Sequence, residues 1–159
     1  MRRGRIIAVI FVFALVISSL AYGAVRMNSR NFAILCSNGS LHDVQAALDA
    51  GAKPTEQVLI TASYSNPDPE VTRLLISSAQ RYGLDFSKRP RTGAGILNSA
   101  IRGGRPEVVR VVMSFGVNVN VRDKTGTSPM SEALRYGYKS EEQGRREIIE
   151  ILSDAGAKR

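Results

Sequence analysis

Glycine followed by a small or apolar residue recurs through residues 31–159, and this recurrence constrains the fold more than any other feature. The four turns are Gly51-Ala52-Lys53, Gly83-Leu84-Asp85, Gly116-Val117-Asn118 and Gly156-Ala157-Lys158. Their glycines lie 32, 33 and 40 residues apart. A period near 33 residues is typical of proteins built from stacked helical units. One such unit cannot bury its own apolar surface, so we expect each unit to pack against its neighbours.

Each glycine turn follows a segment whose apolar residues share one face of an α-helix. The four runs are Val44, Ala47 and Leu48; Val71, Leu74 and Leu75; Val108, Val109, Val112 and Met113; and Ile148, Ile149 and Leu152. Glycine after such a run suits the left-handed residue that ends many helices. A shorter helical segment precedes each run, at residues 31–38, 55–64, 95–102 and 128–136. The pattern therefore predicts four helix pairs.

The two C-terminal units resemble the ankyrin repeat. Residues 123–134 have the sequence DKTGTSPMSEAL, which is similar to the family pattern D-x-x-G-x-T-P-L-H-x-A-A. Residues 104–109 (GRPEVV) and 116–120 (GVNVN) are similar to the family's G-H-x-E-V-V and G-A-D-V-N. The resemblance implies an all-α ankyrin-repeat solenoid of about four helix-turn-helix repeats. We place these repeats at about 31–54, 55–86, 87–120 and 121–159.

Several positions depart from the family pattern. Asn98 and Ser131 stand where the family has a histidine in the first helix, so the hydrogen bond that this histidine makes between repeats is expected to be altered or missing. The extra residues 79–82 are expected to lengthen the second helix of the second unit. The extra residues 138–144 are expected to lie between the helices of the fourth unit.

The first thirty residues differ from the rest of the chain, because they hold five arginines and no acidic residue. Arg2, Arg3 and Arg5 precede an unbroken apolar run at 6–17, and small residues follow it. This order is typical of a secretory signal peptide, predicted here at 1–21 and followed by a linker at 22–30. The alternative is an uncleaved membrane anchor, because residues 6–25 are long enough to cross about 30 Å of hydrocarbon as a helix.

Both interpretations of this segment predict that the repeat domain is exported, because arginines before an apolar run stay on the cytoplasmic side of the membrane. The domain is then periplasmic or secreted, or it is anchored with the repeats outside the cytoplasm. The formal net charge of the chain is +8, and the N-terminal arginines supply most of it. Residues 31–159 hold 17 basic and 14 acidic residues, which is an ordinary balance.

Few residues offer chemistry. A single cysteine and a single histidine exclude a disulfide framework and the usual Cys/His zinc sites, and no metal or cofactor is predicted. His42, beside Asp43, is expected to face solvent at a helix start. Cys36 is expected to be a small buried apolar residue. We therefore expect that the protein is not an enzyme.

The ankyrin resemblance implies partner binding through the turn tips and the exposed face of the first helices. Residues 81–110 hold seven basic and two acidic residues, so a concave Arg-rich face and an acidic protein partner are expected. The candidate partner-binding residues are Arg89, Arg91, Arg102, Arg122, Lys124, Arg135 and Tyr136. Thr92 and Ala94 are expected to be exposed beside Arg91, at the turn tip of the third unit. The partner is a protein to be scaffolded or inhibited. The alternatives are a membrane-anchored module that contacts anionic lipid or a membrane protein, and a nucleic-acid-binding domain.

Overall fold

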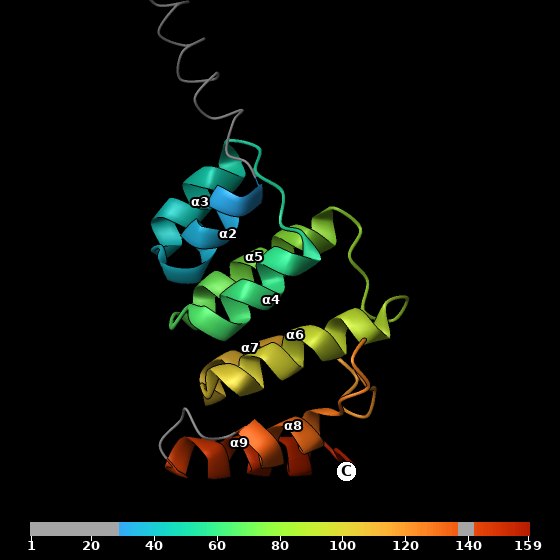
Figure 1. Cartoon of the computed structure of the whole chain (residues 1–159). Helices are drawn as coiled ribbons and strands as arrows, with labels where there is room; N and C mark the ends of the chain where they lie inside the picture. Colours follow the sequence, from blue (N-terminus) through green and yellow to red (C-terminus); the bar gives the residue numbers. More distant parts are fainter. Residues whose placement is uncertain (1–28, 137–141) are drawn as a thin grey trace, which may run out of the picture.

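The computed structural model describes residues 29–136 and 142–159, and within these residues the chain is all helical, without strands. The predicted all-α class is therefore confirmed. The helices are α2 (Ser29–Asn38), α3 (Leu41–Asp49), α4 (Glu56–Ser65), α5 (Pro69–Arg81), α6 (Pro90–Gly103), α7 (Pro106–Ser114), α8 (Pro129–Tyr136) and α9 (Glu142–Asp154) (Figure 1).

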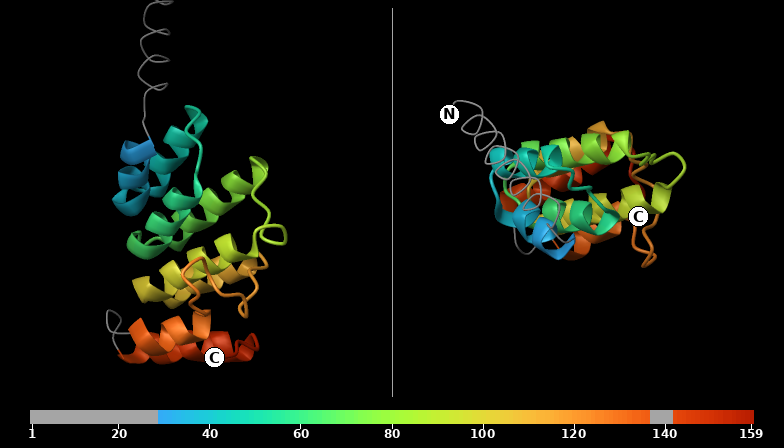
Figure 2. Two further views of the ribbon diagram at one scale, coloured as in Figure 1. Left: turned by 45° about the vertical axis from the view of Figure 1, so that its right-hand side comes forward. Right: turned by 90° about the horizontal axis from the view of Figure 1, so that it is seen from above.

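Successive helices pack in pairs, and the pairs stack on one another in chain order (Figures 1 and 2). Helices α2, α4, α6 and α8 contact one another in sequence and form a layer that we call the first-helix layer. Helices α3, α5, α7 and α9 form the second-helix layer in the same way. Each pair therefore touches mainly the pair before it and the pair after it, as expected from the repeating sequence.

The helix boundaries follow from local sequence signals. The hydroxyls of Ser40 and Thr55 accept hydrogen bonds from backbone N–H groups in the first turns of α3 and α4, at 3.2 and 3.3 Å. Proline occupies the first turn of α5, α6 and α7, where its missing N–H costs nothing. All four predicted glycine turns have positive φ angles, between 74° and 94°.

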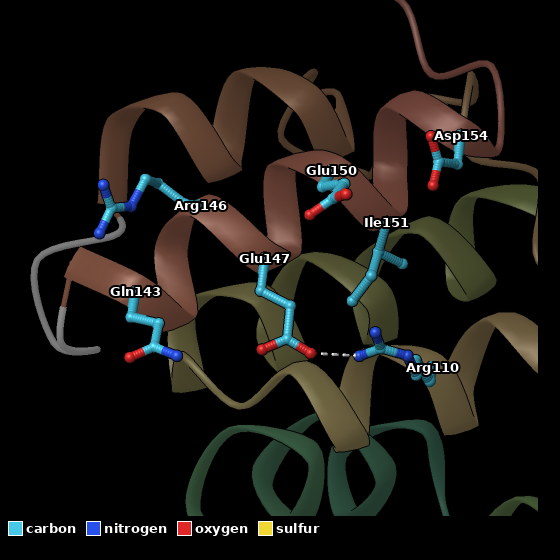
Figure 3. Close-up of a pocket in the computed structure, with 7 residues that line it drawn as sticks. All are labelled: Arg110, Gln143, Arg146, Glu147, Glu150, Ile151 and Asp154. Carbon is cyan, nitrogen blue, oxygen red and sulfur yellow. Dashed lines mark hydrogen bonds and ion pairs between the residues drawn. The ribbon is translucent and has the colours of Figure 1, made fainter.

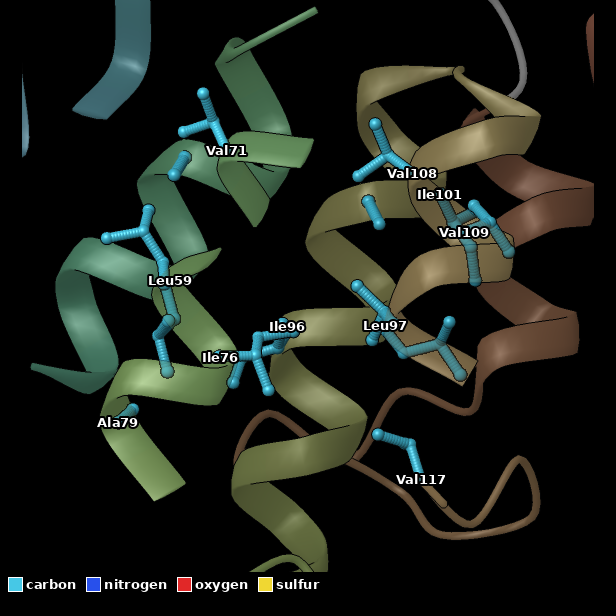
Figure 4. Close-up of a cluster of buried hydrophobic side chains, with 14 of the residues drawn as sticks. Leu59, Val71, Ile76, Ala79, Ile96, Leu97, Ile101, Val108, Val109 and Val117 are labelled. Atoms are coloured by element: carbon cyan, nitrogen blue, oxygen red, sulfur yellow. The ribbon is translucent and has the colours of Figure 1, made fainter. Parts of the chain in front are cut away.

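The predicted apolar runs form the core between the two layers. Leu75 of α5 and Val109 of α7 are completely buried. Figure 4 shows that side chains of α4, α5, α6 and α7 lie between the helices, and that Val117 of the following turn joins them. Apolar residues at helical spacing thus form one continuous core across the stack instead of four separate ones.

The structure corrects two helix boundaries. Helix α6 begins at Pro90, not at Gly95, so Thr92 and Ala94 are buried in its first turns and are not exposed at a turn tip. These turns pack closely against their surroundings, because a Cβ at Gly93 would lie 3.3 Å from side-chain atoms of both Phe86 and Val117. Helix α9 begins at Glu142, so residues 142–144 are helical and do not belong to a loop.

The longer second helix of the second unit is confirmed. Helix α5 has 13 residues, against nine in α3 and nine in α7. In the residues that the structure describes, no helix is long and apolar enough to cross a membrane. The predicted signal peptide or anchor at 1–25 lies outside those residues, as does most of the expected insertion in the fourth unit.

Candidate partner-binding surface

Charge is divided unequally between the second-helix layer and the rest of the described chain. Among the described residues, the second-helix layer carries eight acidic and five basic residues. The first-helix layer and the turns carry five acidic and twelve basic residues. The predicted partner-binding residues all belong to the first-helix layer or to the turns next to it, and we call the surface that these residues form the first-helix face. A surface with this excess of arginine and lysine attracts acidic macromolecules over several ångströms.

Arg89 and Arg91 lie at the start of α6 and are both exposed. Arg89 is the residue before the helix, and its side chain makes no capping hydrogen bond. It lines a hollow of about 170 Å³ together with Glu56, Tyr82 and Thr92. These arginines are therefore presented to solvent at the edge of the stack, as the sequence predicted.

Lys124 contacts a residue that sequence reasoning missed. Its Nζ lies 2.6 Å from Oε1 of Glu56, at the start of α4. The other carboxylate oxygen of Glu56 accepts a hydrogen bond of 3.2 Å from the hydroxyl of Thr92 in α6. One carboxylate thus joins the second, third and fourth units. Residues 68 positions apart carry no sequence signal for such a contact.

Arg102 and Arg135 lie on the walls of one pocket of about 420 Å³. The Nε of Arg102, in the last turn of α6, forms an ion pair with Oε1 of Glu132 in α8. Glu132 is 1% exposed, whereas the Arg102 side chain keeps 39% of its surface exposed. Thr125 and Thr127 complete the lining. Burial of a carboxylate is costly without a partner, so Glu132 holds Arg102 in place.

The turn before α8 is organised by Asp123. Its carboxylate accepts hydrogen bonds from the backbone N–H groups of Thr125 and Thr127, at 2.8 and 3.0 Å, and from the Asn98 amide at 2.9 Å. Burial raises the pKa of Asp123, but hydrogen bonds from Thr125, Asn98 and Thr127 outweigh it and hold the pKa below its ordinary value. Asn98 therefore links two units, so the expected interrepeat hydrogen bond is altered at this position and is not missing.

The remaining predicted residues are placed as follows. Arg122 donates a hydrogen bond of 2.9 Å to the carbonyl of Gly126 and so braces the same turn. Tyr136 is the last residue of α8, and its side chain lies outside the described part of the structure. The structure thus brings Arg102, Arg122 and Arg135 together around one turn.

His42 and Cys36, the two residues considered for a catalytic role, lie in different surroundings. His42 is exposed at the second position of α3, as predicted, and the neighbouring Asp43 accepts a hydrogen bond of 2.7 Å from Ser40. Cys36 is completely buried, and burial raises the pKa of its thiol to about 12. In residues 29–136 and 142–159, no group of His, Cys, Asp and Glu side chains has a geometry that could hold a metal ion.

A third hollow lies between α7 and α9, in the second-helix layer. Its volume is about 550 Å³, and Figure 3 shows Glu147 facing Arg110 within it; Arg146, Glu150 and Asp154 also belong to the lining. Nη1 of Arg110 donates a hydrogen bond of 2.8 Å to Glu147. Because its acidic and basic groups nearly balance, this hollow has no marked preference for either sign of charge.

The comparisons with known proteins give one partial similarity. M-phase phosphoprotein 8 of Mus musculus is 27% identical to this chain over 104 residues. The matched part covers 62% of this chain and 12% of that protein, so the chain spans a small fraction of its relative. No protein-family model matches the sequence. No solved structure matches it either.

Proposed function

We propose that the chain is an ankyrin-repeat protein that binds another protein through its first-helix face and has no catalytic activity of its own. Four stacked helix pairs, each ended by a glycine turn, and the DKTGTSPM sequence before α8 support the membership. The unequal division of charge carries the proposal about the partner. The first-helix layer and the turns together carry twelve basic and five acidic residues, and this excess of positive charge favours an acidic protein surface as the partner.

The exposed arginines support protein binding over a merely solvated surface. Arg89 and Arg91 project from one helix start, and Tyr82, which is 55% exposed, lies beside the same hollow. Arginine and tyrosine are enriched among residues that contribute most to binding energy in protein interfaces. Cys36 packs in the core and His42 is exposed at a helix start, so the position of each is explained without a catalytic role. This supports a scaffold or an inhibitor over an enzyme.

The place of action follows from the N-terminal sequence. The arginines and apolar run at residues 2–17 support export of the repeat domain, either with cleavage of a signal peptide or with the domain anchored at the membrane. The partner is then a protein of the same compartment. N-terminal sequencing of the protein from its native cells distinguishes cleavage near residue 21 from an intact anchor.

Photo-crosslinking tests the proposed face. A photoreactive residue in place of Arg91 is expected to capture a protein in the native cells, because Arg91 is exposed on α6. The tested variant, Arg89→Glu with Arg122→Glu, reverses two charges of the proposed face and is expected to lose the crosslinked product. The matched control reverses two charges of the second-helix layer, Arg81→Glu with Arg146→Glu, and is expected to retain it. Equal crosslinking in the two double variants would contradict the proposal.

A further inference from the structure

A hollow of about 170 Å³ lies where the start of α4, the end of α5 and the start of α6 come together. Apolar residues of α4 and α5 contribute to its lining, and the exposed residues Tyr82 and Arg89 belong to it as well. We propose that this hollow accepts one aromatic side chain of the partner protein. The inference rests on the function proposed above, and it names the kind of side chain that the partner contributes.

The most deeply buried residues of the hollow are apolar. Leu59 of α4 is 1% exposed and Ala79 of α5 is 4% exposed, and Leu84 of the glycine turn packs against the same core. The volume of 170 Å³ is close to that of an apolar cavity of about 150 Å³ that binds benzene, so the hollow has room for one aromatic ring. Because such a ring leaves water for contact with buried apolar residues, its burial contributes favourably to binding.

Three polar side chains of the lining already have partners within the chain. The carboxylate of Glu56 lies 2.6 Å from Nζ of Lys124 and accepts a hydrogen bond of 3.2 Å from the hydroxyl of Thr92. The hydroxyl of Thr55 accepts a hydrogen bond of 3.3 Å from the backbone N–H of Val58. An aromatic ring can therefore enter without taking a partner from these groups, and so without the cost of leaving a buried polar group unpaired.

Tyr82 and Arg89 favour an aromatic ring over an aliphatic side chain. Tyr82 is 55% exposed, and Nζ of Lys53 lies 5.2 Å from the centre of its ring. Among the residues that the structure describes, the exposed guanidinium of Arg89 has no hydrogen-bond or ion-pair partner. Aromatic rings attract one another in offset or edge-to-face pairs, and a guanidinium group stacks on the face of a ring. Each of the two residues can therefore contribute an attraction that a leucine side chain does not receive.

The test is an NMR titration of the full-length chain at low salt with two pentapeptides, in which glutamates flank a central phenylalanine or a central leucine. Both peptides carry the same charge, so the ratio of their Kd values isolates the contribution of the ring. We expect the phenylalanine peptide to bind about three- to tenfold more tightly and to shift the methyl resonances of Leu59 and Ala79 through its ring current. Tyr82→Ala and Arg89→Gln are each expected to lower this ratio by about twofold or more. Tyr82→Phe, which keeps the ring, and Arg146→Gln, which removes one charge from α9, are expected to preserve it.

Equal Kd values of the two peptides for the unmodified chain, or no measurable binding of either, would overturn the proposed aromatic site. An unchanged ratio in either Tyr82→Ala or Arg89→Gln would overturn it as well; both side chains are exposed, and circular dichroism verifies that the variants are folded. Crosslinking from position 91 separates this failure from that of the proposed function. If the preference for phenylalanine is absent and the Arg89/Arg122 reversal still loses the crosslinked partner, the aromatic site is refuted and the protein-binding function stands.

Discussion

Leu75→Ala is the change that tests the stacked core most directly. Leu75 lies in α5 and is completely buried, and α5 packs against α3, α4 and α7. Truncation to alanine removes three carbon atoms, which corresponds to about 2–2.5 kcal/mol of lost transfer free energy. The cavity left between two rows of helices adds to this loss because the neighbouring helices relax only in part. We therefore expect a total loss of about 3–4 kcal/mol.

Urea denaturation followed by circular dichroism at 222 nm measures this free energy of unfolding. The matched control is Leu74→Ala, because Leu74 lies on the same helix but is only partly buried. We expect the control to lose less than half as much as Leu75→Ala. A loss below about 1 kcal/mol for Leu75→Ala, or equal losses for the two variants, would refute the assignment of the buried stripe. A broadened transition in the variant would show that the units unfold separately, as stacked repeats sometimes do.

Three further predictions concern single residues. The pKa of Asp123 is lowered in the folded protein, so its contribution to stability is present above the pKa of the unfolded state and is lost as the pH falls through the folded value. Asp123→Ala is expected to lower the free energy of unfolding by about 1–3 kcal/mol at pH 7. Urea titrations at several pH values are expected to show that the variant loses less stability on acidification than the unmodified protein does. The Cys36 thiol is buried and its pKa is raised to about 12, so iodoacetamide at pH 8 is expected to alkylate it only in urea, which mass spectrometry measures. Rapid alkylation of the native chain would contradict its burial. The free energy of unfolding is also expected to fall as the pH rises from 9 toward 12. At Gly116 (φ +75°) and at Gly95 of α6 an added Cβ would meet no other atom within contact distance, so only the backbone conformation decides the effect of alanine. Gly116→Ala is expected to destabilise the protein by about 1–2 kcal/mol, because alanine disfavours a positive φ, whereas Gly95→Ala is expected to stabilise the helix by up to about 1 kcal/mol. Thermal melts that rank the two variants the other way would contradict this argument.

The contact between Lys124 and Glu56 affects how the first-helix face meets a partner. The lysine was predicted to bind an acidic partner, and in the structure a carboxylate of the same chain lies 2.6 Å from it. The pair is partly exposed, so it contributes little to stability. A partner that uses Lys124 must displace Glu56, whereas Arg89 and Arg91 are exposed without such a rearrangement.

The sequence by itself determined the local features of this protein. The glycine turns and the apolar faces of the helices were predictable, because each depends on residues within one or two helical turns. Helix α6 shows where such local signals end. The glycines at 93 and 95 are typical of a loop, but in the structure these turns are helical and Gly93 packs closely against Phe86 and Val117.

Only the tertiary structure decided how the charged residues are used. The Arg102–Glu132 pair joins residues 30 positions apart, the Asn98–Asp123 hydrogen bond 25, and the Lys124–Glu56 pair 68. Long polar side chains reach several neighbours, and a sequence pattern does not show which neighbour the stacking of units brings within reach. The composition of the first-helix face was therefore readable from the sequence, whereas its pocket and its internal ion pairs depend on the contacts between units.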